Sequence, residues 1–491
     1  MTASSDIRAG SHTRSLARLN RPSGPTRERE RDRVWDVLVV GCGTAGLVAA
    51  KTAARMGAHV LVVESERLGG DCLFTGCVPS KTLLASARAG LGFEAAMKRV
   101  RGAVTAIAPD DDQASLEAAG AVVRPGVVRF TGPGEAEVSG VPVRFLQAVI
   151  ATGASPSLPP IEGLADADRL TSDTVWDLDE LPQRLTVLGG GPIGCELSQA
   201  FAGLGAQVTL VEAADRLIGS EDPEASRVVL EALRAGGVDV RLGAVAAAAS
   251  AGSVTLDDGS TIGHDRVLVA VGRRPRTADL GLDRVGVEVD ERGFVRVDDS
   301  LRTTNPRILA AGDLTGHPQF THVAGVHGST AGSNAALGLR RGVSEVVPRV
   351  TYTHPEVAAV GASTDTDAQP KGWRTLTHQH GDVDRAVAEG ETQGFTRLVV
   401  DKRGRVKGGT IVGPRAGESL GEISLAVSQG LKLTAIAGMT HPYPTWNDGI
   451  WSATTSDLQR TLERGAVKTA LKAVSRTRRL WLKTRDRLAD S

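Results

Sequence analysis

The sequence predicts an α/β fold: two Rossmann-like dinucleotide-binding domains followed by a C-terminal α+β domain. Three observations support this prediction. A glycine-rich loop between a buried strand and a helix occurs twice, beginning at residues 41 and 189. In both copies an acidic residue ends the next strand, 23 residues after the first glycine, as a dinucleotide fold requires. In the third region, strands around 397–400 and 409–412 alternate with helical patterns, which is typical of an antiparallel sheet covered by helices.

The first loop follows the apolar run 37–40 and precedes an Ala-rich helix. Its glycines allow the backbone to approach a pyrophosphate at the helix N-terminus. The next strand ends at Glu64, which can accept hydrogen bonds from a ribose. Cys42, inside the loop, is interpreted as a small packed residue. The fingerprint glycines are Gly41, Gly43 and Gly46.

The second loop repeats this plan and leads to a strand that ends at Glu212. A carboxylate there can bind a ribose 2′-hydroxyl and would repel a 2′-phosphate, so we expect NADH to be preferred over NADPH. Arg216 and Arg273 are close enough in sequence to weaken that preference. Cys195 is interpreted as structural. The fingerprint glycines are Gly189, Gly191 and Gly194. Two such loops predict that the protein binds two dinucleotides.

A stretch after the first loop contains Cys72 and Cys77, followed by a helical pattern over 80–89. Pro79 suits the first turn of a helix, which places Cys77 near a helix N-terminus. The helix dipole and free backbone N–H groups lower the pKa of a thiol there. The pair is therefore predicted to be reactive rather than inert.

Composition restricts the other functions. A formal net charge of zero gives no indication of nucleic-acid binding. The longest apolar run, 37–50, is interrupted by three glycines, so no transmembrane segment is expected. Four cysteines in 491 residues do not make a secreted disulfide scaffold, and a disulfide in a cytosolic protein is usually catalytic. We expect a soluble, cytoplasmic protein, and the sequence gives no metal site.

The cysteine stretch, residues 69–81, resembles the redox-disulfide signature of the class I pyridine nucleotide–disulfide oxidoreductases, which include mercuric reductase and dihydrolipoamide dehydrogenase. Phe74 stands where members often carry Asn. The resemblance covers about 34–460 and implies FAD and NAD(P)H as cofactors. It also implies that Cys77 faces the flavin and Cys72 is the interchange thiol. Lys81 is implied to lie near the flavin and to pair with Glu196.

Further motifs resemble the same family. Ala151, Thr152 and Gly153 are similar to the segment that returns the chain to the flavin. Gly272 belongs to a segment similar to the exit from the nicotinamide domain, and Asp313 takes the position of an aspartate that bonds the flavin ribityl chain.

The resemblance implies a homodimer and a division of the chain into six parts. The N-terminal part carries eight arginines against four acids, and the C-terminal part carries eight Lys/Arg against two acids. For the C-terminal part we expect a solvated basic helix that packs on its own dimer, with peripheral membrane contact as the alternative. The parts are a disordered basic tail (1–33), the first FAD-binding segment (34–160), an NAD(P)-binding domain (161–275), the second FAD-binding segment (276–345), a dimerisation domain (346–464) and a basic helix (465–491).

One departure concerns proton transfer. Members that act on dithiols carry a His-Pro-Thr-x-x-Glu segment, in which the His moves the proton and the Glu orients it. Here Tyr443 occupies the His position and Asp448 the Glu position, while His441 lies two residues upstream. Mercuric reductase also has tyrosine in this region, but it relays its ion through a C-terminal cysteine pair. This chain has no cysteine after Cys195.

We therefore expect an FAD-dependent NAD(P)H oxidoreductase that passes electrons through a Cys72–Cys77 disulfide to an unidentified small-molecule acceptor. Two alternatives stay open. One is a diaphorase or quinone-type reductase, in which the flavin passes its electrons on directly. The other is a redox- or NADH-sensing subunit of low turnover.

Overall fold

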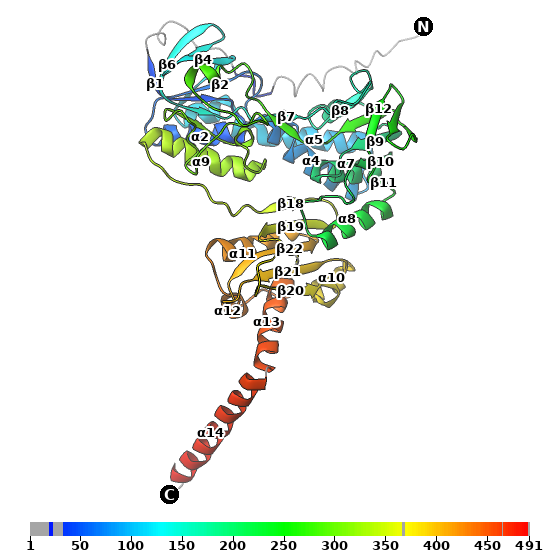
Figure 1. Ribbon diagram of the computed structural model, residues 1–491, viewed down its shortest axis with the longest axis vertical. Coiled ribbons are helices and arrows are strands. Elements are labelled where there is room, and N and C mark those ends of the chain that lie inside the picture. The colour runs from blue at the N-terminus through cyan, green and yellow to red at the C-terminus, as the bar shows by residue number, and fades with distance from the viewer. Residues whose placement is uncertain (1–18, 23–32, 366–368, 464, 490–491) are drawn as a thin grey trace, which may run out of the picture. The chain divides into compact units, whose positions relative to one another are not determined.

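The computed structural model describes residues 19–22, 33–365, 369–463 and 465–489, which form two compact units (Figure 1). The first unit contains the described residues up to Ile218 and the segment Leu233–Glu345. The second contains Gly219–Ala232 and the described residues from Val346 onward. The predicted basic tail lies almost entirely outside the described residues.

The first unit contains a seven-stranded sheet with the order β3-β2-β1-β6-β5-β4, in which β17 also pairs with β6. β17 runs parallel to β6, with Ile308 opposite Ala148. The chain therefore returns to its first sheet after the second dinucleotide-binding segment, as the sequence predicted. The strands are β1 (Val34–Val40), β2 (Val60–Glu64), β3 (Ala121–Pro125), β4 (Val128–Gly132), β5 (Glu135–Val138), β6 (Val141–Ile150) and β17 (Ile308–Ala310).

Two helices, α2 (Thr44–Arg55) and α9 (Thr321–Leu337), pack together beside this sheet (Figure 1). Their backbones approach so closely that a Cβ at Gly328 would lie 2.4 Å from the carbonyl oxygen of Ala45. A Cβ at Gly332, one turn further along α9, would lie 2.5 Å from the carbonyl oxygen of Ala49. Glycine at both positions therefore permits the contact, which fixes the start of α9 beside the first glycine loop.

The second sheet of this unit is entirely parallel and has the order β11-β10-β9-β15-β8. Parallel strands buried on both faces are apolar along their length, as β9 and β15 are. A three-stranded antiparallel sheet, β12-β13-β14, and a two-stranded ribbon, β7-β16, complete the strands of the unit. The strands are β7 (Ala154–Pro156), β8 (Arg169–Thr171), β9 (Arg184–Leu188), β10 (Gln207–Glu212), β11 (Asp239–Leu242), β12 (Ala246–Ala249), β13 (Ser253–Leu256), β14 (Thr261–Gly263), β15 (Arg266–Val269) and β16 (Arg273–Pro275).

The cysteine stretch forms two helices, and the second begins at Cys77, three residues before the predicted pattern over 80–89, which places Cys77 at a helix N-terminus. This helix, α4, packs against α5 and against α7, the helix that follows the second glycine loop (Figure 1). The remaining helices of the unit are α3 (Gly70–Phe74), α4 (Cys77–Arg88), α5 (Phe93–Ile107), α6 (Gln113–Ala118) and α7 (Pro192–Gly203), with short 3-10 turns at Ala108–Asp111, Val175–Asp177, Leu282–Val285 and Asp313–Thr315.

The second unit is built on an antiparallel sheet with the order β18-β19-β22-β21-β20, covered by helices, as the sequence predicted for this region. A buried apolar cluster joins β19, β21 and β22 to α11 and α13. The elements are β18 (Arg349–Thr351), β19 (Glu356–Gly361), β20 (Arg374–Gln379), a 3-10 turn (His380–Asp382), β21 (Phe395–Val400), β22 (Val406–Gly413), α10 (Asp384–Glu389), α11 (Ala416–Ser428), α12 (Leu433–Ala437), α13 (Asp448–Glu463) and α14 (Gly465–Ala489).

The segment Gly219–Ala232 contains the start of α8 (Pro223–Ala235) and groups with the second unit. The predicted domain boundaries stay a prediction. Ion pairs join this segment to the rest of the second unit. Arg397 of β21 pairs with Asp222, at 2.7 Å, and with Glu224, and the Arg397 and Asp222 side chains are largely buried.

Candidate functional site

Both glycine loops have the same backbone construction. Gly41 has φ +91°, and a Cβ there would lie 2.6 Å from the carbonyl oxygen of Ala151. Gly189 has φ +107°, and a Cβ there would lie 2.5 Å from the carbonyl oxygen of Ala270. Each loop therefore requires glycine where it turns against the carboxyl end of a neighbouring strand. Gly46 and Gly194 allow the following helix to lie against that turn.

The residues at both loops fit a dinucleotide pyrophosphate. Gly43 and Gly191 are the N-caps of α2 and α7, and neither helix has a side-chain cap. Backbone N–H groups at an uncapped helix N-terminus can bind a phosphate. A Cβ at Gly191 would meet no atom within 4 Å, and one at Gly43 would meet only Gly70, at 3.7 Å. Room for a ligand therefore lies directly over each helix start.

The two predicted ribose-binding acids also hold their loops. Glu64 accepts hydrogen bonds from the backbone N–H groups of Cys42, at 2.7 Å, and Glu66, at 2.8 Å. Glu212 accepts the corresponding bonds from Gly190 and Ala214. The structural repeat between the two loops therefore includes the carboxylates as well as the glycines. Burial raises the pKa of Glu64.

Three elements of the first unit bring the redox cysteines together with a hydroxyl. Cys72 lies in α3, Cys77 is the first residue of α4, and Thr321 is the first residue of α9. Both cysteines are free thiols, and the Cys77 sulfur lies 3.2 Å from the Thr321 Oγ1. Cys72 lies close enough to Cys77 for each thiol to shift the pKa of the other. The Cys77 sulfur therefore lies beside a hydroxyl and a second thiol, both of which can donate to a Cys77 thiolate.

These contacts separate the pKa values of the two thiols. Hydrogen bonding with Cys72, together with Thr321 and the Lys81 charge, outweighs burial and lowers the pKa of Cys77 to about 6. The same bond raises the pKa of Cys72 well above the ordinary value of a thiol, and burial adds to this effect. Cys77 is therefore a thiolate at neutral pH, while Cys72 keeps its proton.

Lys81 lies one helical turn after Cys77 on α4, on the same face. Its Nζ is 2.8 Å from Glu196 Oε2 on α7, so the ion pair that the resemblance implied is present. The Glu196 side chain is only 6% exposed, whereas Lys81 is 34% exposed. The pair joins the cysteine helix to the helix of the second glycine loop.

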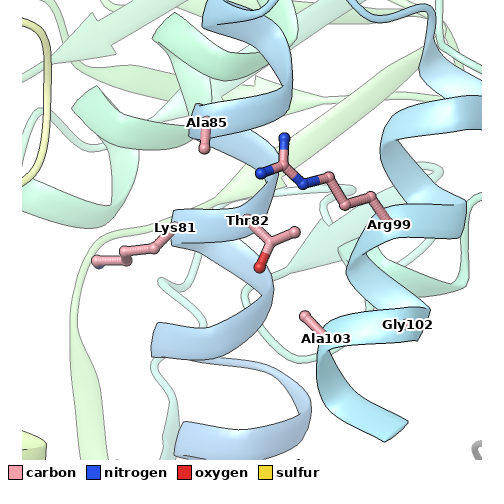
Figure 2. Close-up of a pocket in the computed structure, with 6 residues that line it drawn as sticks. All are labelled: Lys81, Thr82, Ala85, Arg99, Gly102 and Ala103. Atoms are coloured by element: carbon pink, nitrogen blue, oxygen red, sulfur yellow. The ribbon is translucent and has the colours of Figure 1, made fainter. Parts of the chain in front are cut away.

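A shallow cavity of about 590 Å³ opens between α4 and α5 (Figure 2). Arg99 of α5 reaches across it toward α4, and Lys81 lies at its edge. The remaining lining residues are small: Thr82, Ala85, Gly102 and Ala103. The cavity therefore extends from the Lys81–Glu196 pair along the side of the cysteine helix, and neither cysteine lines it.

A charged network that the sequence did not reveal lies next to Cys72. Arg273 of β16 pairs with Asp71, the residue before Cys72, and donates to the carbonyl oxygen of Ala154. Its other amino group lies 3.6 Å from Asp173. Arg276 lies 3.7 Å from Asp71 and 3.8 Å from Asp173. Arg273, which the sequence linked to nucleotide choice, is thus engaged beside the cysteine helix.

The flavin-type motifs converge on the same network. Thr152 donates to the carbonyl oxygen of Arg276 at 2.6 Å, and the N–H of Arg276 donates to Gly153. This ties the 151–153 turn to the segment that begins at Gly272. Asp313 is largely buried, which raises its pKa, and its charged surroundings include Arg273 and Asp71.

In the second unit, the Tyr443 hydroxyl donates to Asp384 of α10, which raises the pKa of Tyr443. Asp448 accepts from the N–H of Thr445, at 3.2 Å, and starts α13, where a carboxylate stabilises the helix N-terminus. Asp384 is therefore the side chain in contact with the Tyr443 hydroxyl, and the orienting role of Asp448 stays a prediction.

His441 is held by neighbours in the same unit. Its Nε2 is 3.1 Å from Glu422, its Nδ1 is 3.1 Å from the carbonyl oxygen of Met439, and its side chain is 4% exposed. Glu422 also accepts a bond from Asn447. These contacts hold His441 within its own unit and anchor the loop that carries Tyr443.

The other two cysteines are buried. Burial raises the pKa of Cys42 and of Cys195, and the Cys195 thiol donates to the carbonyl oxygen of Gly190 at 3.3 Å. Both observations agree with a structural role. Among the described residues, no cluster of three or more His, Cys, Asp or Glu side chains could hold a metal ion. The described helices include none with the length and apolar character needed to cross a bilayer.

Two dinucleotide loops joined to a dithiol define an oxidoreductase that uses two nucleotides and a cysteine pair. Comparison with known families agrees. Residues 35–328 match the pyridine nucleotide-disulphide oxidoreductase family, and residues 347–454 match its dimerisation domain. The chain belongs to this family of FAD-dependent enzymes, which use NAD(P)H and a redox-active disulfide.

Individual relatives carry several names. The chain is 35% identical to a mercuric reductase of Bacillus cereus over 85% of this chain and 70% of the relative. It is 33% identical to a dihydrolipoyl dehydrogenase of Thermus scotoductus over 86% and 97%. Among solved structures, it is similar to the HOCl-induced flavoprotein disulfide reductase RclA of Escherichia coli, with TM-score 0.80, 27% identity and coverage of 85% and 99%. It is also similar to LpdA of Mycobacterium tuberculosis, with TM-score 0.79, 30% identity and coverage of 86% and 99%.

Proposed function

We propose that this protein is a homodimeric reductase that passes electrons from NADH through FAD and the Cys72–Cys77 pair to a small-molecule acceptor. The observation that carries the proposal is the placement of Cys72 and Cys77 beside the Thr321 hydroxyl and the Lys81–Glu196 ion pair. When bound, the flavin takes two electrons from the nicotinamide and delivers them to sulfur. The dimerisation domain supports the homodimer. The cytoplasmic location stays a prediction.

The residues divide between the two nucleotides. The FAD-binding set would be Gly41, Gly43, Gly46, Glu64, Ala151, Thr152, Gly153 and Asp313, with Lys81 and Glu196 at the redox end. The NAD(P)H-binding set would be Gly189, Gly191, Gly194, Glu212 and Gly272.

The cysteines account for the protons and electrons of the exchange. Reduction of the disulfide by two electrons and one proton leaves the Cys77 thiolate and the protonated Cys72 thiol. Thr321 and Lys81 stabilise the negative charge on Cys77, and Glu196 holds Lys81 in place. By the family resemblance Cys72 is the interchange thiol, and because it keeps its proton it must lose that proton before it can attack an acceptor.

The group available for proton transfer restricts which substrates can react at Cys72. Exchange at Cys72 with a dithiol or disulfide substrate needs a neighbouring group that takes and returns a proton near neutral pH. An ordinary histidine titrates at about 6.5, whereas a tyrosine titrates at about 10. Asp384 raises the pKa of Tyr443 further, so Tyr443 stays protonated and is a poor base. We therefore propose that dihydrolipoamide and oxidised glutathione are poor substrates.

A panel of acceptors tests this function. With NADH, we expect ready reduction of dyes and quinones and weak reduction of oxidised glutathione. With NAD+ as the electron acceptor, we expect weak oxidation of dihydrolipoamide. Retention of dye reduction in Cys72→Ser would favour the diaphorase alternative for those acceptors, and its loss would assign them to the dithiol. Strong dihydrolipoamide turnover that His441→Ala abolishes and Tyr443→Phe leaves unchanged would show that His441 is the base.

Nucleotide choice is tested separately. Glu212 keeps a carboxylate at the end of β10, and Arg273 is engaged with Asp71 and Asp173. We expect kcat/KM to be higher for NADH than for NADPH, and Glu212→Ala to narrow the difference by about tenfold, the effect of removing one charge repulsion. A clear preference of the wild type for NADPH would contradict the assignment.

A further inference from the structure

The C-terminal helix α14 carries an exposed apolar face. It has 25 residues and lies outside the segments that the two family models match. Val467, Leu471, Val474 and Trp481 follow one another at spacings of four, three and seven residues, which places them on one helix face. All four are exposed, and Val474 is 67% exposed. Of the described side chains from 465 to 485, every one except Leu482 is exposed.

The opposite face of α14 is basic. Its residues recur every three or four positions: Lys468, Lys472, Arg476, Arg479 and Lys483. Arg478 and Arg485 follow Val474 and Trp481 at i+4 on the same helix stripe, with their guanidinium carbons 4.4 Å and 5.6 Å from the centre of the Trp481 ring. With eight Lys/Arg against two acids in residues 465–491, the helix is both amphipathic and strongly cationic.

Charge complementarity decides what can cover this face. A second copy of α14 would bring two cationic helices together, with Arg478 and Arg485 beside like charges. The chain's own N-terminal segment, residues 1–33, is also basic, with eight arginines against four acids. At 0.1 M salt, screening limits the interaction between exposed charges to about 10 Å. The local positive charge of the helix therefore determines which partner it attracts, although the formal net charge of the whole chain is zero. The occupant must be anionic.

The apolar face distinguishes between anionic partners. A nucleic acid would neutralise the lysines but leave Val467, Leu471 and Val474 in water. An anionic bilayer satisfies both faces, because the apolar side chains enter the boundary between headgroups and acyl chains. Trp481 would lie at the depth where tryptophan is enriched in membrane proteins, and the Lys and Arg ammonium and guanidinium groups can reach lipid phosphates.

We propose that α14 docks this protein on the surface of an anionic lipid bilayer, lying in the plane of the interface with the Val467–Leu471–Val474–Trp481 face inserted. The inference does not depend on the identity of the electron acceptor.

Vesicle sedimentation of the full-length holoprotein tests the proposal. We expect binding to vesicles of phosphatidylcholine mixed with phosphatidylglycerol, weakening as salt is raised, and little binding to phosphatidylcholine alone. Lys472→Glu with Lys483→Glu should weaken the binding by about thirtyfold or more, because each basic residue near an anionic surface contributes substantially. Trp481→Ser should weaken it by about tenfold, since the apolar contact is lost.

Leu480→Ser is the matched control. Leu480 is 59% exposed, adjacent to Trp481 and turned away from the apolar face, so its replacement should leave vesicle binding unchanged. Equal loss in Leu480→Ser and Trp481→Ser, or equal sedimentation with both kinds of vesicle, would overturn the proposal. A change in the molecular mass of Trp481→Ser in light scattering, with vesicle binding unchanged, would assign the apolar face to self-association and overturn the proposal. Binding of the wild type to duplex DNA but not to bilayers would also overturn it.

Discussion

The dithiol region and the loop that carries Tyr443 both place a titratable group beside hydrogen-bonding neighbours, but they shift its pKa in opposite directions. Cys77 is half-buried and receives hydrogen bonds from Cys72 and Thr321, which lower its pKa to about 6. Tyr443 is 72% exposed and donates to the Asp384 carboxylate, which raises its pKa. The chain thus stabilises a thiolate for electron transfer, whereas its tyrosine is made a weaker base.

The largest effect is expected from removing the exchange thiol. Cys72→Ser should reduce NADH-dependent reduction of any disulfide substrate by about a thousandfold or more, because a covalent step is lost. Steady-state rates with such a substrate measure the loss. Cys195→Ser is the control, since its hydroxyl can still donate to the carbonyl oxygen of Gly190. If Cys72→Ser retained wild-type rates, the dithiol would have no part in turnover.

A smaller effect, in the direction of gain, is expected at the tyrosine. Tyr443→His would place a group with a pKa of about 6.5 beside Asp384, and a positioned general base contributes about 100-fold or more. We expect dihydrolipoamide turnover to rise by about tenfold to 100-fold. Tyr443→Phe should give no gain, and adding Asp384→Asn should reduce the gain of Tyr443→His. A gain in Tyr443→Phe as well would mean that space, rather than a base, limits the reaction.

Local spacing explains what the sequence could predict. Short motifs predict three features of the fold. These are the strand–loop–helix units, the position of Cys77 near the N-terminus of α4 and the return of β17 to the first sheet. The Lys81–Glu196 pair followed from the family resemblance, because both residues belong to recognisable motifs. These features depend on sequence patterns of a few residues.

The contacts that sequence reasoning missed join distant segments. Thr321 is 244 residues from Cys77, and Arg273 is 202 residues from Asp71. Only the packing of α9 against α2 and the position of β16 bring them to the cysteines. The contact between Tyr443 and Asp384 was missed for a similar reason, since Asp384 is 59 residues away and belongs to no motif. The sequence feature that could have indicated this network is Asp71, the acidic residue next to Cys72, which would need a basic partner.

The smallest effect concerns the charges around Cys77 and tests whether its low pKa depends on them. Lys81 lowers the pKa of Cys77 and Glu196 raises it, while the hydrogen bond from Cys72 makes the largest contribution. Lys81→Met should therefore raise the pKa of Cys77, and Glu196→Gln should lower it. The titration of the thiolate ultraviolet absorbance in the reduced protein measures both pKa changes, with Cys77→Ser as the blank.

For the wild type we expect a titration midpoint near pH 6, with the thiolate present above it. At a pH close to that midpoint, Lys81→Met should be alkylated by iodoacetamide at Cys77 about threefold more slowly, because less thiolate is present. The double variant should return toward the wild-type midpoint, since the two charges oppose each other. A wild-type midpoint near the value of an ordinary thiol, unchanged in Lys81→Met, would show that Cys77 is not stabilised as a thiolate and that the contrast with Tyr443 does not hold.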